Sequence, residues 1–454
     1  MGSLDDIFKA YDIRGVVPDQ LNAELAKKIG TAFATFAKSP SIVVGRDMRP
    51  SGVELVAAFT EGATAAGVDV VLLGLTSSDE LLYASGALGS PGVMFTASHN
   101  PARYNGIKLC LAGARPVGVE SGLVDIRDAI EVGDLPTVSE GERGRVSHRD
   151  VLADYAAKVR SFVDRDALLP LRVIADTANG MGGLVVPAVF EGLPFDLEVL
   201  YPELDGNFPN HPADPIQPAN LVDLQARILE KGADVGLAFD GDADRCFLVD
   251  DKAQPVSGST TTAIVAKAIL EKYPGSTILY NLICSKAVPE VIRENGGTPV
   301  MTRVGHSYIK ALMAETGAAF GGEHSGHYYF RDNYRADSGS IAALMVLEVI
   351  SKAGVPLSEL RRPFDRYALS GEINTEVTGS PARVIEAVSE HFAAEHPEAN
   401  QSRLDGLTVD FGDWWFNVRP SNTEPLVRLN VEAADRASCD AHTQVVLSLI
   451  RGVS

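Results

Sequence analysis

Apolar residues along the first hundred positions change from one spacing to another. Between Leu21 and Phe36 they recur every three to four residues, which predicts the apolar face of an amphipathic helix. Short runs of consecutive apolar residues then fall at 41–47, 68–73 and 92–95, separated by stretches of helical character. Buried strands that alternate with helices are typical of βαβ units, so we expect a mainly parallel sheet.

The same order of three apolar runs returns twice. The later runs lie at 171–176, 195–201 and 233–239, and then at 276–281, 298–302 and 318–320. In each set the third run leads into a polar loop: TASHNP (Thr96–Pro101), DGDADR (Asp240–Arg245) and GEHSGH (Gly322–His327). Ligands of open parallel sheets gather beyond the carboxyl ends of the strands. The pattern therefore indicates three similar domains around one cleft, although any α/β protein shows some such alternation.

Beyond about residue 363 the pattern changes. Strand-like runs at 367–375, 407–411 and 427–431 accompany helical stretches at 381–392 and 442–450, which suggests an α+β domain. This part holds the loop RPSNTEP (Arg419–Pro425). The predicted fold is α/β, with three similar mixed-sheet α/β domains and a smaller C-terminal α+β domain around a central cleft. The predicted borders are 1–148, 149–253, 254–364 and 365–454.

Composition narrows the functional classes. The chain has 454 residues, 45% of them hydrophobic and 22% charged, as in ordinary globular proteins of several domains. A formal net charge of −20 disfavours nucleic acids and anionic membranes as partners, so a cleft that binds phosphate would have to be locally positive. Four scattered cysteines, the lack of a secretory segment and the lack of a run of about 20 apolar residues predict a cytoplasmic protein. Its oligomeric state, monomer or dimer, stays open.

The loop DGDADR places three carboxylates at alternate positions directly after an apolar strand: Asp240, Asp242 and Asp244. Carboxylates without histidine or cysteine suit Mg²⁺ or Ca²⁺. A calcium-binding hand requires glycine at the sixth position, where this chain has Arg245, and flanking helices rather than strands. A solvated acidic turn is the plain alternative. The sequence favours Mg²⁺.

Ser98 lies in the loop TASHNP, where a serine can be a nucleophile, a turn former or a helix cap. We expect a turn at 104–106 (Tyr-Asn-Gly) and a returning strand at 107–111, which would bring Lys108 back toward the loop. A serine, an ammonium group and a metal triad form a plausible set for phosphoryl transfer. Esterase chemistry is disfavoured because no Gly-x-Ser-x-Gly motif surrounds Ser98.

The remaining two loops carry groups that suit a phosphorylated sugar. Glu323, Ser325 and His327 offer carboxylate, hydroxyl and imidazole groups for sugar hydroxyls, whereas a zinc site would need another spacing. The other loop offers donors for a phosphate dianion: Arg419, Ser421, Asn422 and Thr423. Taken alone, each loop is equally consistent with a plain polar turn.

Together and in this order, the four loops resemble the α-D-phosphohexomutase superfamily, which interconverts 1- and 6-phosphorylated sugars. The resemblance covers nearly the whole chain. It implies three similar α/β domains and a smaller fourth one around a deep cleft. It also implies a phosphoserine, one Mg²⁺ ion and a hexose 1,6-bisphosphate that serves as intermediate and activator.

Residue roles follow from the same resemblance. Ser98 corresponds to the phosphorylated serine and would hold Mg²⁺ with the three aspartates, Lys108 would be a general acid/base, and Arg245 would assist the transferring group. The substrate-binding residues would be Tyr11, Arg14, His99, His306, Glu323, Ser325 and His327, together with Arg419, Ser421, Asn422 and Thr423 as the clamp for the non-reacting phosphate.

The subfamily is a narrower question. Ser-Gly-His in the sugar loop is similar to phosphomannomutases, including dual mannose/glucose enzymes, and to phosphoglucosamine mutases, which usually have Ser-Gly-Thr in the clamp. We therefore expect a phosphomannomutase that also accepts glucose. Dual enzymes often carry a lysine where this chain has Ile283, and Lys286 is a candidate substitute. The rival hypotheses are a Mg²⁺-dependent phosphatase with Asp240 as nucleophile and a non-catalytic phosphosugar-binding protein.

Overall fold

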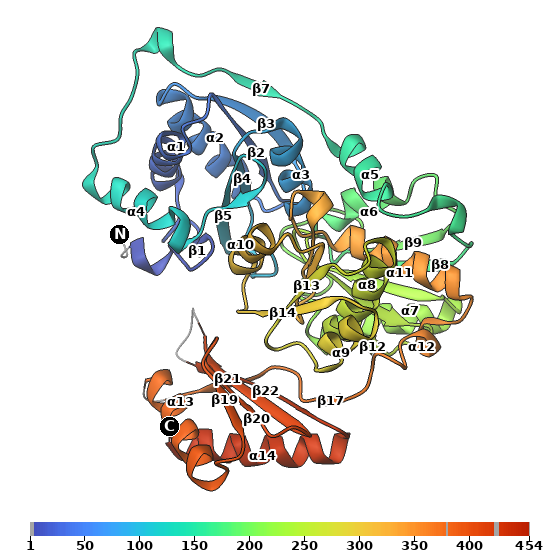
Figure 1. Ribbon diagram of the computed structural model, residues 1–454. Helices are drawn as coiled ribbons and strands as arrows, with labels where there is room; N and C mark the ends of the chain where they lie inside the picture. The colour runs from blue at the N-terminus through green and yellow to red at the C-terminus, as the bar shows by residue number, and fades with distance from the viewer. Residues whose placement is uncertain (1–3, 378–379, 422–425, 454) are drawn as a thin grey trace.

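The computed structural model describes residues 4–377, 380–421 and 426–453. Its strands form four sheets that follow one another along the chain. Figure 1 shows the first domain at the upper left, the second and third side by side at the right, and the fourth below. The predicted α/β architecture with a smaller fourth domain is confirmed. Within the described residues, no helix is long and apolar enough to cross a membrane.

The first domain is built on a seven-stranded mixed sheet. Its strands are β1 (Ile13–Val16), β2 (Ser41–Arg46), β3 (Asp69–Leu75), β4 (Gly92–Phe95), β5 (Tyr104–Leu111), β6 (Arg115–Pro116) and β7 (Val146–His148). Its helices are α1 (Ala23–Ala37), α2 (Gly52–Ala65), α3 (Ser78–Leu88) and α4 (Leu123–Val132). The order β1-β5-β4-β2-β3-β7 places β2 parallel to β3 and β4, whereas β5 runs antiparallel to β4 and β1.

The predicted amphipathic helix is α1. Its first turn is capped by Asn22, whose side chain accepts a hydrogen bond from the Leu25 N–H. Its apolar face packs on α2 at a contact that requires glycine, because a Cβ atom on Gly30 would lie 2.2 Å from the Phe59 carbonyl oxygen. The two helices therefore touch backbone to backbone over the sheet.

The second and third domains have smaller sheets but share one apolar core. The second domain holds β8 (Arg172–Asp176), β9 (Asp196–Leu200), β10 (Val235–Phe239), β11 (Cys246–Asp250), β12 (Pro255–Val256), α5 (Leu152–Arg160), α6 (Gly182–Phe190) and α7 (Val222–Lys231). The third holds β13 (Thr277–Asn281), β14 (Thr298–Thr302), β15 (Phe320–Gly322), β16 (Tyr328–Phe330), α8 (Gly258–Lys272), α9 (Ala287–Glu294), α10 (His306–Thr316), α11 (Gly339–Ala353) and α12 (Leu357–Leu360). A single buried cluster runs from α6 and β10 into α8 and α11, so these two domains form a common body. Because β12 pairs with β11, the second sheet extends beyond residue 253.

The three predicted loops occupy equivalent positions in the first three sheets. Each follows a strand that has a parallel neighbour and turns into an antiparallel strand: β4 into β5, β10 into β11, and β15 into β16. The threefold pattern in the sequence is therefore a repeated structural unit. One local expectation is wrong: residues 104–106 form no turn but begin β5, where they pair with β1. Long-range pairing overrides the turn preference of Asn-Gly.

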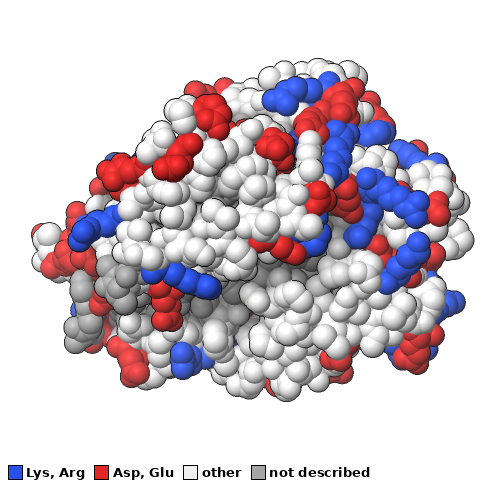
Figure 2. All heavy atoms as spheres, turned by 90° about the horizontal axis from the view of Figure 1, so that it is seen from below, with Lys and Arg blue, Asp and Glu red and all other residues white. Residues whose placement is uncertain are grey.

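The fourth domain has an antiparallel sheet with two helices on one face. Its elements are β17 (Ala368–Leu369), β18 (Ile373–Glu376), β19 (Asn400–Ser402), β20 (Leu407–Asp410), β21 (Trp414–Pro420), β22 (Leu426–Ala433), α13 (Pro381–Glu395) and α14 (Arg436–Val453). One face of β21 and β22, with Phe416, Val418 and Leu429, packs into an apolar core with the helices. The opposite face carries polar residues. Figure 2 shows acidic and basic side chains interspersed on the underside of the molecule, so the net negative charge forms no uniform field there.

Candidate active site

Ser98 lies at the tip of the loop that joins β4 to β5. Its backbone has the left-handed conformation (φ 50°), which is uncommon for a residue other than glycine. Its backbone N–H donates to the Thr96 hydroxyl oxygen at 2.9 Å, and its hydroxyl donates to Asp240 Oδ2 at 2.7 Å. The loops of the first and second domains thus meet at the predicted serine and the first aspartate.

Arg49 fixes the shape of the Ser98 loop and was not foreseen from the sequence. Its side chain is fully buried beside Asp47 and donates to four carbonyl oxygens of the loop, those of Ser98, Asn100, Pro101 and Tyr104, at 2.7 to 2.9 Å. Its Nε bonds Asp47 Oδ2 at 3.1 Å. The polar run after β2, two arginines and an aspartate in GRDMR, is the signal that could have pointed to it.

The three aspartates converge as predicted. Asp240, Asp242 and Asp244 are buried, and one carboxylate oxygen of each lies within 4.8 Å of the others. The Oδ1 atoms of Asp242 and Asp244 are buried without any hydrogen-bond donor among the described residues. Buried carboxylate oxygens are rarely left unsatisfied, so the donor set fits a hard cation bound between them. The aspartate loop can hold a divalent metal ion.

Two cations pair with these three carboxylates and leave one negative charge without a counter-charge. The Lys108 ammonium donates to Asp242 Oδ2 at 2.6 Å and to Asp244 Oδ2 at 2.7 Å. Burial would lower the pKa of Lys108, but these two carboxylates raise it above its ordinary value, so its ammonium form is favoured. Burial raises the pKa of Asp240 to about 7 although the Arg245 guanidinium opposes this shift. The predicted approach of Lys108 to the site is therefore found in the structure.

Arg245 joins the serine to the aspartates. Its Nε donates to Asp240 Oδ2 at 2.9 Å, and its Nη2 lies 3.2 Å from the Ser98 hydroxyl oxygen and 2.6 Å from His99 Nδ1. Burial and the charge of Arg245 hold the pKa of His99 well below its ordinary value, so the imidazole is neutral and accepts from the guanidinium. Arg14 lies on the other side of the loop, where its side chain bonds Asn100 and Asp12.

A cavity of about 170 Å³ opens above these groups. Its walls include Tyr11, Arg14, Ser98, His99, Lys108, Asp244, Arg245, His306 and His327, all of which the sequence had singled out. Ser78, Lys310 and Asp337 also line it and were not foreseen. Ser78 at the start of α3 bonds Asp242, and its N–H donates to the Asp242 carbonyl oxygen at 3.0 Å. Most of the predicted residues of the first three domains therefore face one space.

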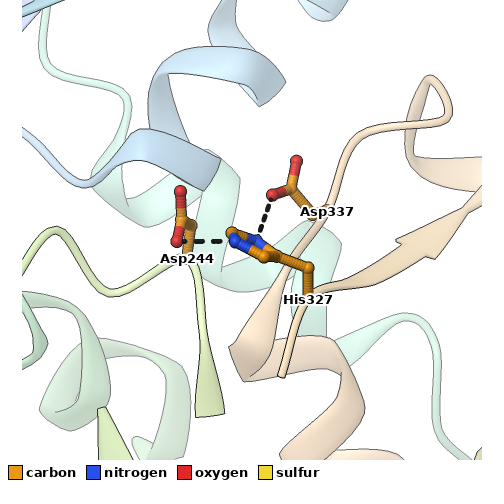
Figure 3. Close-up of side chains that lie close together, drawn as sticks. All are labelled: Asp244, His327 and Asp337. Carbon is orange, nitrogen blue, oxygen red and sulfur yellow. Dashed lines mark hydrogen bonds and ion pairs between the residues drawn. The ribbon is translucent and has the colours of Figure 1, made fainter. Parts of the chain in front are cut away.

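His327 forms the third-domain wall of this cavity. Figure 3 shows its Nδ1 between two carboxylates, 2.9 Å from Asp337 Oδ2 and 3.8 Å from Asp244 Oδ1. Burial opposes protonation, yet these carboxylates raise the pKa of His327. Lys310 also pairs with Asp337, at 2.7 Å. These three ligand atoms could also approach one ion, but Asp337 is already neutralised by Lys310 and His327, so the better metal site is the aspartate loop.

The other predicted sugar residues are placed differently. Glu323 is buried and accepts from the Tyr329 hydroxyl at 2.6 Å and from Asn281 Nδ2 at 3.2 Å, and the Ser325 hydroxyl donates to it at 3.3 Å. The carboxylate is therefore occupied by its own domain and shapes the loop. His306 begins α10 and packs against Tyr11, with ring centroids 5.2 Å apart.

The fourth-domain loop is described in part. Arg419 lies on β21, where the sequence had suggested only a loop, and Asn422 and Thr423 fall outside the described residues. The Ser421 N–H bonds the Leu426 carbonyl oxygen at 2.9 Å. Arg428 on β22 is the cross-strand partner of Arg419 and is a second arginine that was not foreseen. None of the described fourth-domain residues lines the cavity.

Lys286 does not reach the cavity. Its Nζ donates to Asp410 Oδ1 at 2.6 Å and to the Gly412 carbonyl oxygen at 2.8 Å, so it ties the third domain to the fourth. Ile283 is buried. The structure therefore gives no support to Lys286 as a substitute phosphate ligand.

The cavity between the domains has at its base a serine hydroxyl, buried aspartates with unsatisfied oxygens, a lysine and an arginine. These groups define a phosphoryl-transfer enzyme of the four-domain α/β class. Comparison with protein families agrees. Models of phosphoglucomutase/phosphomannomutase α/β/α domains I, II and III match residues 5–133, 153–254 and 257–367, and the model of the C-terminal domain matches residues 372–443. The chain belongs to the phosphoglucomutase/phosphomannomutase family, whose members are isomerases.

Individual relatives span the same length. A phosphomannomutase of Salmonella montevideo is 40% identical over 456 residues, which cover 98% of each chain. The phosphohexose mutases of Xanthomonas campestris are 39% identical over 448 residues, which cover 98% of this chain and 99% of theirs. The crystal structure of a phosphoglucomutase/phosphomannomutase family protein from Burkholderia thailandensis superposes with a TM-score of 0.90 at 32% identity and covers 99% of this chain and 98% of that one.

Proposed function

We propose that this protein reversibly interconverts mannose 6-phosphate and mannose 1-phosphate in the cytoplasm, and glucose phosphates as well, through phosphorylated Ser98 and a hexose 1,6-bisphosphate. The observation that carries the proposal is the Ser98 hydroxyl, 2.7 Å from Asp240 at the base of the cavity. Phosphomannomutase relatives at 40% identity support mannose as substrate. The Asn422 position of the clamp motif favours this over a phosphoglucosamine mutase, which stays the alternative.

Mg²⁺ would be held by Asp240, Asp242 and Asp244 with an oxygen of the Ser98 phosphate. When bound, it neutralises charge on the transferring phosphoryl group. The two unsatisfied Oδ1 atoms support this assignment. The chain's own cations complete the surroundings, because Lys108 and Arg245 lie within hydrogen-bond reach of the same carboxylates.

In the forward half-reaction the bond between Ser98 Oγ and phosphorus breaks and a bond between a sugar hydroxyl oxygen and phosphorus forms. The hydroxyl gives its proton to a base in the cavity, and Ser98 Oγ takes up a proton. Lys108 is our candidate for this acid/base role: its ammonium form, which Asp242 and Asp244 favour, can supply the proton to Ser98 Oγ, and only the neutral amine left behind can take the proton of the sugar hydroxyl. Arg245 is placed to stabilise the transferring group at 3.2 Å from Ser98 Oγ. His306 and His327 line the same cavity and would contact the sugar.

The bisphosphate then has to turn over, so that its second phosphate faces Ser98. Arg419, Ser421, Asn422 and Thr423 would grip whichever phosphate is distant. Because Arg419 does not line the cavity, the fourth domain must approach for one ligand to touch both sites. Arg419→Ala should weaken the binding of hexose 1-phosphate and hexose 6-phosphate alike. The expected loss of binding free energy is about 1.5–3 kcal/mol, the contribution of a charged hydrogen bond.

The burial of Asp240 disfavours the phosphatase hypothesis. Its carboxylate is fully buried and is covered by Ser98 and Arg245, so a substrate phosphate meets Ser98 first. An assay of mannose, glucose and N-acetylglucosamine 1-phosphates with bisphosphate activator tests the function. We expect 6-phosphate products from mannose and glucose and acid-stable phosphate on Ser98. Release of free phosphate, or binding without interconversion, would refute the proposal.

A further inference from the structure

Glu372 lies directly before β18 and bridges the two arginines of the fourth domain. Its Oε2 accepts from Arg419 Nη2 at 2.5 Å, and its Oε1 accepts from Arg428 Nη1 at 2.9 Å. About a fifth of the Glu372 side chain is exposed, and the Arg419 side chain is 9% exposed. The carboxylate therefore occupies one terminal nitrogen of each guanidinium in this structure.

The two arginines repel one another unless an anion lies between them. Arg419 and Arg428 are directly opposite in the register of β21 and β22, so their side chains lie on the same face. Like charges in this arrangement destabilise a sheet. Among the described residues, the Nε atoms of both are buried without an acceptor. The pair thus has more donors than Glu372 can satisfy, which suits a second anion.

This charged group faces the third domain. Burial lowers the pKa of His324 in the loop GEHSGH, the charge of Glu372 raises it, and the charge of Arg419 lowers it. Val304, just before α10, donates its N–H to Asp405 at 3.1 Å, which brings the fourth domain against the same side of the third. The charges of Glu372 and Arg419 are therefore felt at the sugar loop, and the fourth domain contacts the third at Val304.

We propose that Glu372 is a positioning residue that acts through Arg419 and Arg428: it holds the two guanidinium groups together and weakens their binding of phosphate, so that a bisphosphate can be released and bound again. The inference rests on the proposed function, since only a reaction that exchanges the gripped phosphate needs a weak clamp. With Glu372 the three side chains carry a net charge of +1, and without its charge they carry +2. Phosphate and carboxylate compete for the same N–H donors.

The test starts with inorganic phosphate, whose binding is measured by calorimetry without any turnover. Glu372→Gln keeps the shape and removes the charge, Glu372→Asp keeps the charge, and Glu376→Gln removes an exposed carboxylate at the far end of the adjoining strand β18. Arg419→Ala identifies the share of binding that belongs to the clamp. We expect Glu372→Gln to bind phosphate roughly 4- to 20-fold more tightly, the range that Coulomb's law gives for one charge about 5 Å away in partly screened surroundings.

Kinetics on mannose 1-phosphate then separate this role from a purely structural one. Glu372→Gln should lower KM and kcat together, Glu372→Asp should restore both toward wild type, and Glu376→Gln should change neither. Weaker or unchanged phosphate binding in a folded Glu372→Gln variant, as judged by its melting temperature, overturns the inference. Loss of the proposed mutase activity would be recognised separately, because the phosphate titration does not depend on it.

Discussion

Replacing Arg49 should loosen the Ser98 loop more than any surface change. The side chain is 0% exposed and makes four hydrogen bonds to loop carbonyls besides its ion pair with Asp47. Arg49→Met keeps much of the length and removes all five contacts. Breaking a buried pair from one side costs about 3–5 kcal/mol because the remaining charge stays buried. Each lost charged hydrogen bond adds about 1.5–3 kcal/mol, although such losses do not simply add.

We therefore expect Arg49→Met to lose at least about 3 kcal/mol of unfolding free energy, or to lose protection in the loop itself. Denaturant unfolding gives the first quantity and amide hydrogen exchange across residues 98–104 gives the second. The unfolding free energy of Arg49→Lys, which has three donors in place of a planar fork, should lie between those of the wild type and Arg49→Met. Arg403→Met is the matched control, since its pair with Glu386 is exposed (46% and 60%) and contributes little.

The reasoning would be refuted by an Arg49→Met protein within about 1 kcal/mol of wild type with unchanged exchange in the loop, because a buried pair lost from one side cannot be so small. Phosphorylation of Ser98 should fall in parallel with loop protection. The left-handed backbone of Ser98 is held by this guanidinium, which bonds its carbonyl oxygen at 2.8 Å.

Three further changes have defined outcomes. Ser98→Ala should abolish turnover and leave the melting temperature near wild type; substantial remaining activity would exclude Ser98 as the phosphate carrier. Mg²⁺ should raise the melting temperature of the wild type, and Asp242→Asn should lose this shift, since one hard ligand fewer leaves too few oxygens; an unchanged shift would contradict the site. Burial raises the pKa of Asp79 to about 7. The folded state therefore binds a proton at Asp79 more tightly than the unfolded state does, and the contribution of Asp79 to the unfolding free energy falls as pH rises from about 4 to 7. Asp79→Asn should gain about 2–4 kcal/mol relative to wild type between pH 5 and 8, measured by denaturant unfolding beside exposed Asp413→Asn; a pH-independent difference would refute it.

The repeated order of strands and loops could be predicted because each apolar run and each polar loop is a short continuous stretch of the sequence. Apolar runs of four to seven residues define β2, β4, β10 and β13 within one or two positions. The returning strand after Ser98 was also expected, but its start was not. Residues 104–106 have turn character, and only pairing with β1, some ninety positions earlier, draws them into β5.

The wider site was less predictable for the same reason. Lys108 was expected to return toward the Ser98 loop, yet its partners Asp242 and Asp244 lie far along the chain in another domain. Arg49, Lys310 and Asp337 carry no motif, and their roles depend on tertiary contacts with residues distant in the sequence, within the first domain for Arg49 and within the third for Lys310 and Asp337. Glu372 precedes β18 and Arg428 lies on β22, and the sequence does not specify the register of these two strands.

The ion pairs around the cavity determine its net charge. The acidic composition had suggested that a phosphate-binding cavity must be locally positive, yet each cation around it is matched. Arg14 pairs with Asp12, Lys108 with Asp242 and Asp244, Arg245 with Asp240, and Lys310 with Asp337. Four cations face five carboxylates, so the side chains alone give a net charge near −1 before any histidine is counted.

A cavity with a net charge near −1 attracts a phosphate dianion weakly. A divalent cation bound between the aspartates would change this net charge to about +1 and would share Asp242 and Asp244 with Lys108, since the Oδ1 atoms of both have no hydrogen-bond donor among the described residues. Lys108 would then have fewer carboxylate contacts and would be available to the phosphate. The proposed metal site therefore predicts that phosphosugar affinity depends on the metal even before any phosphoryl group is transferred.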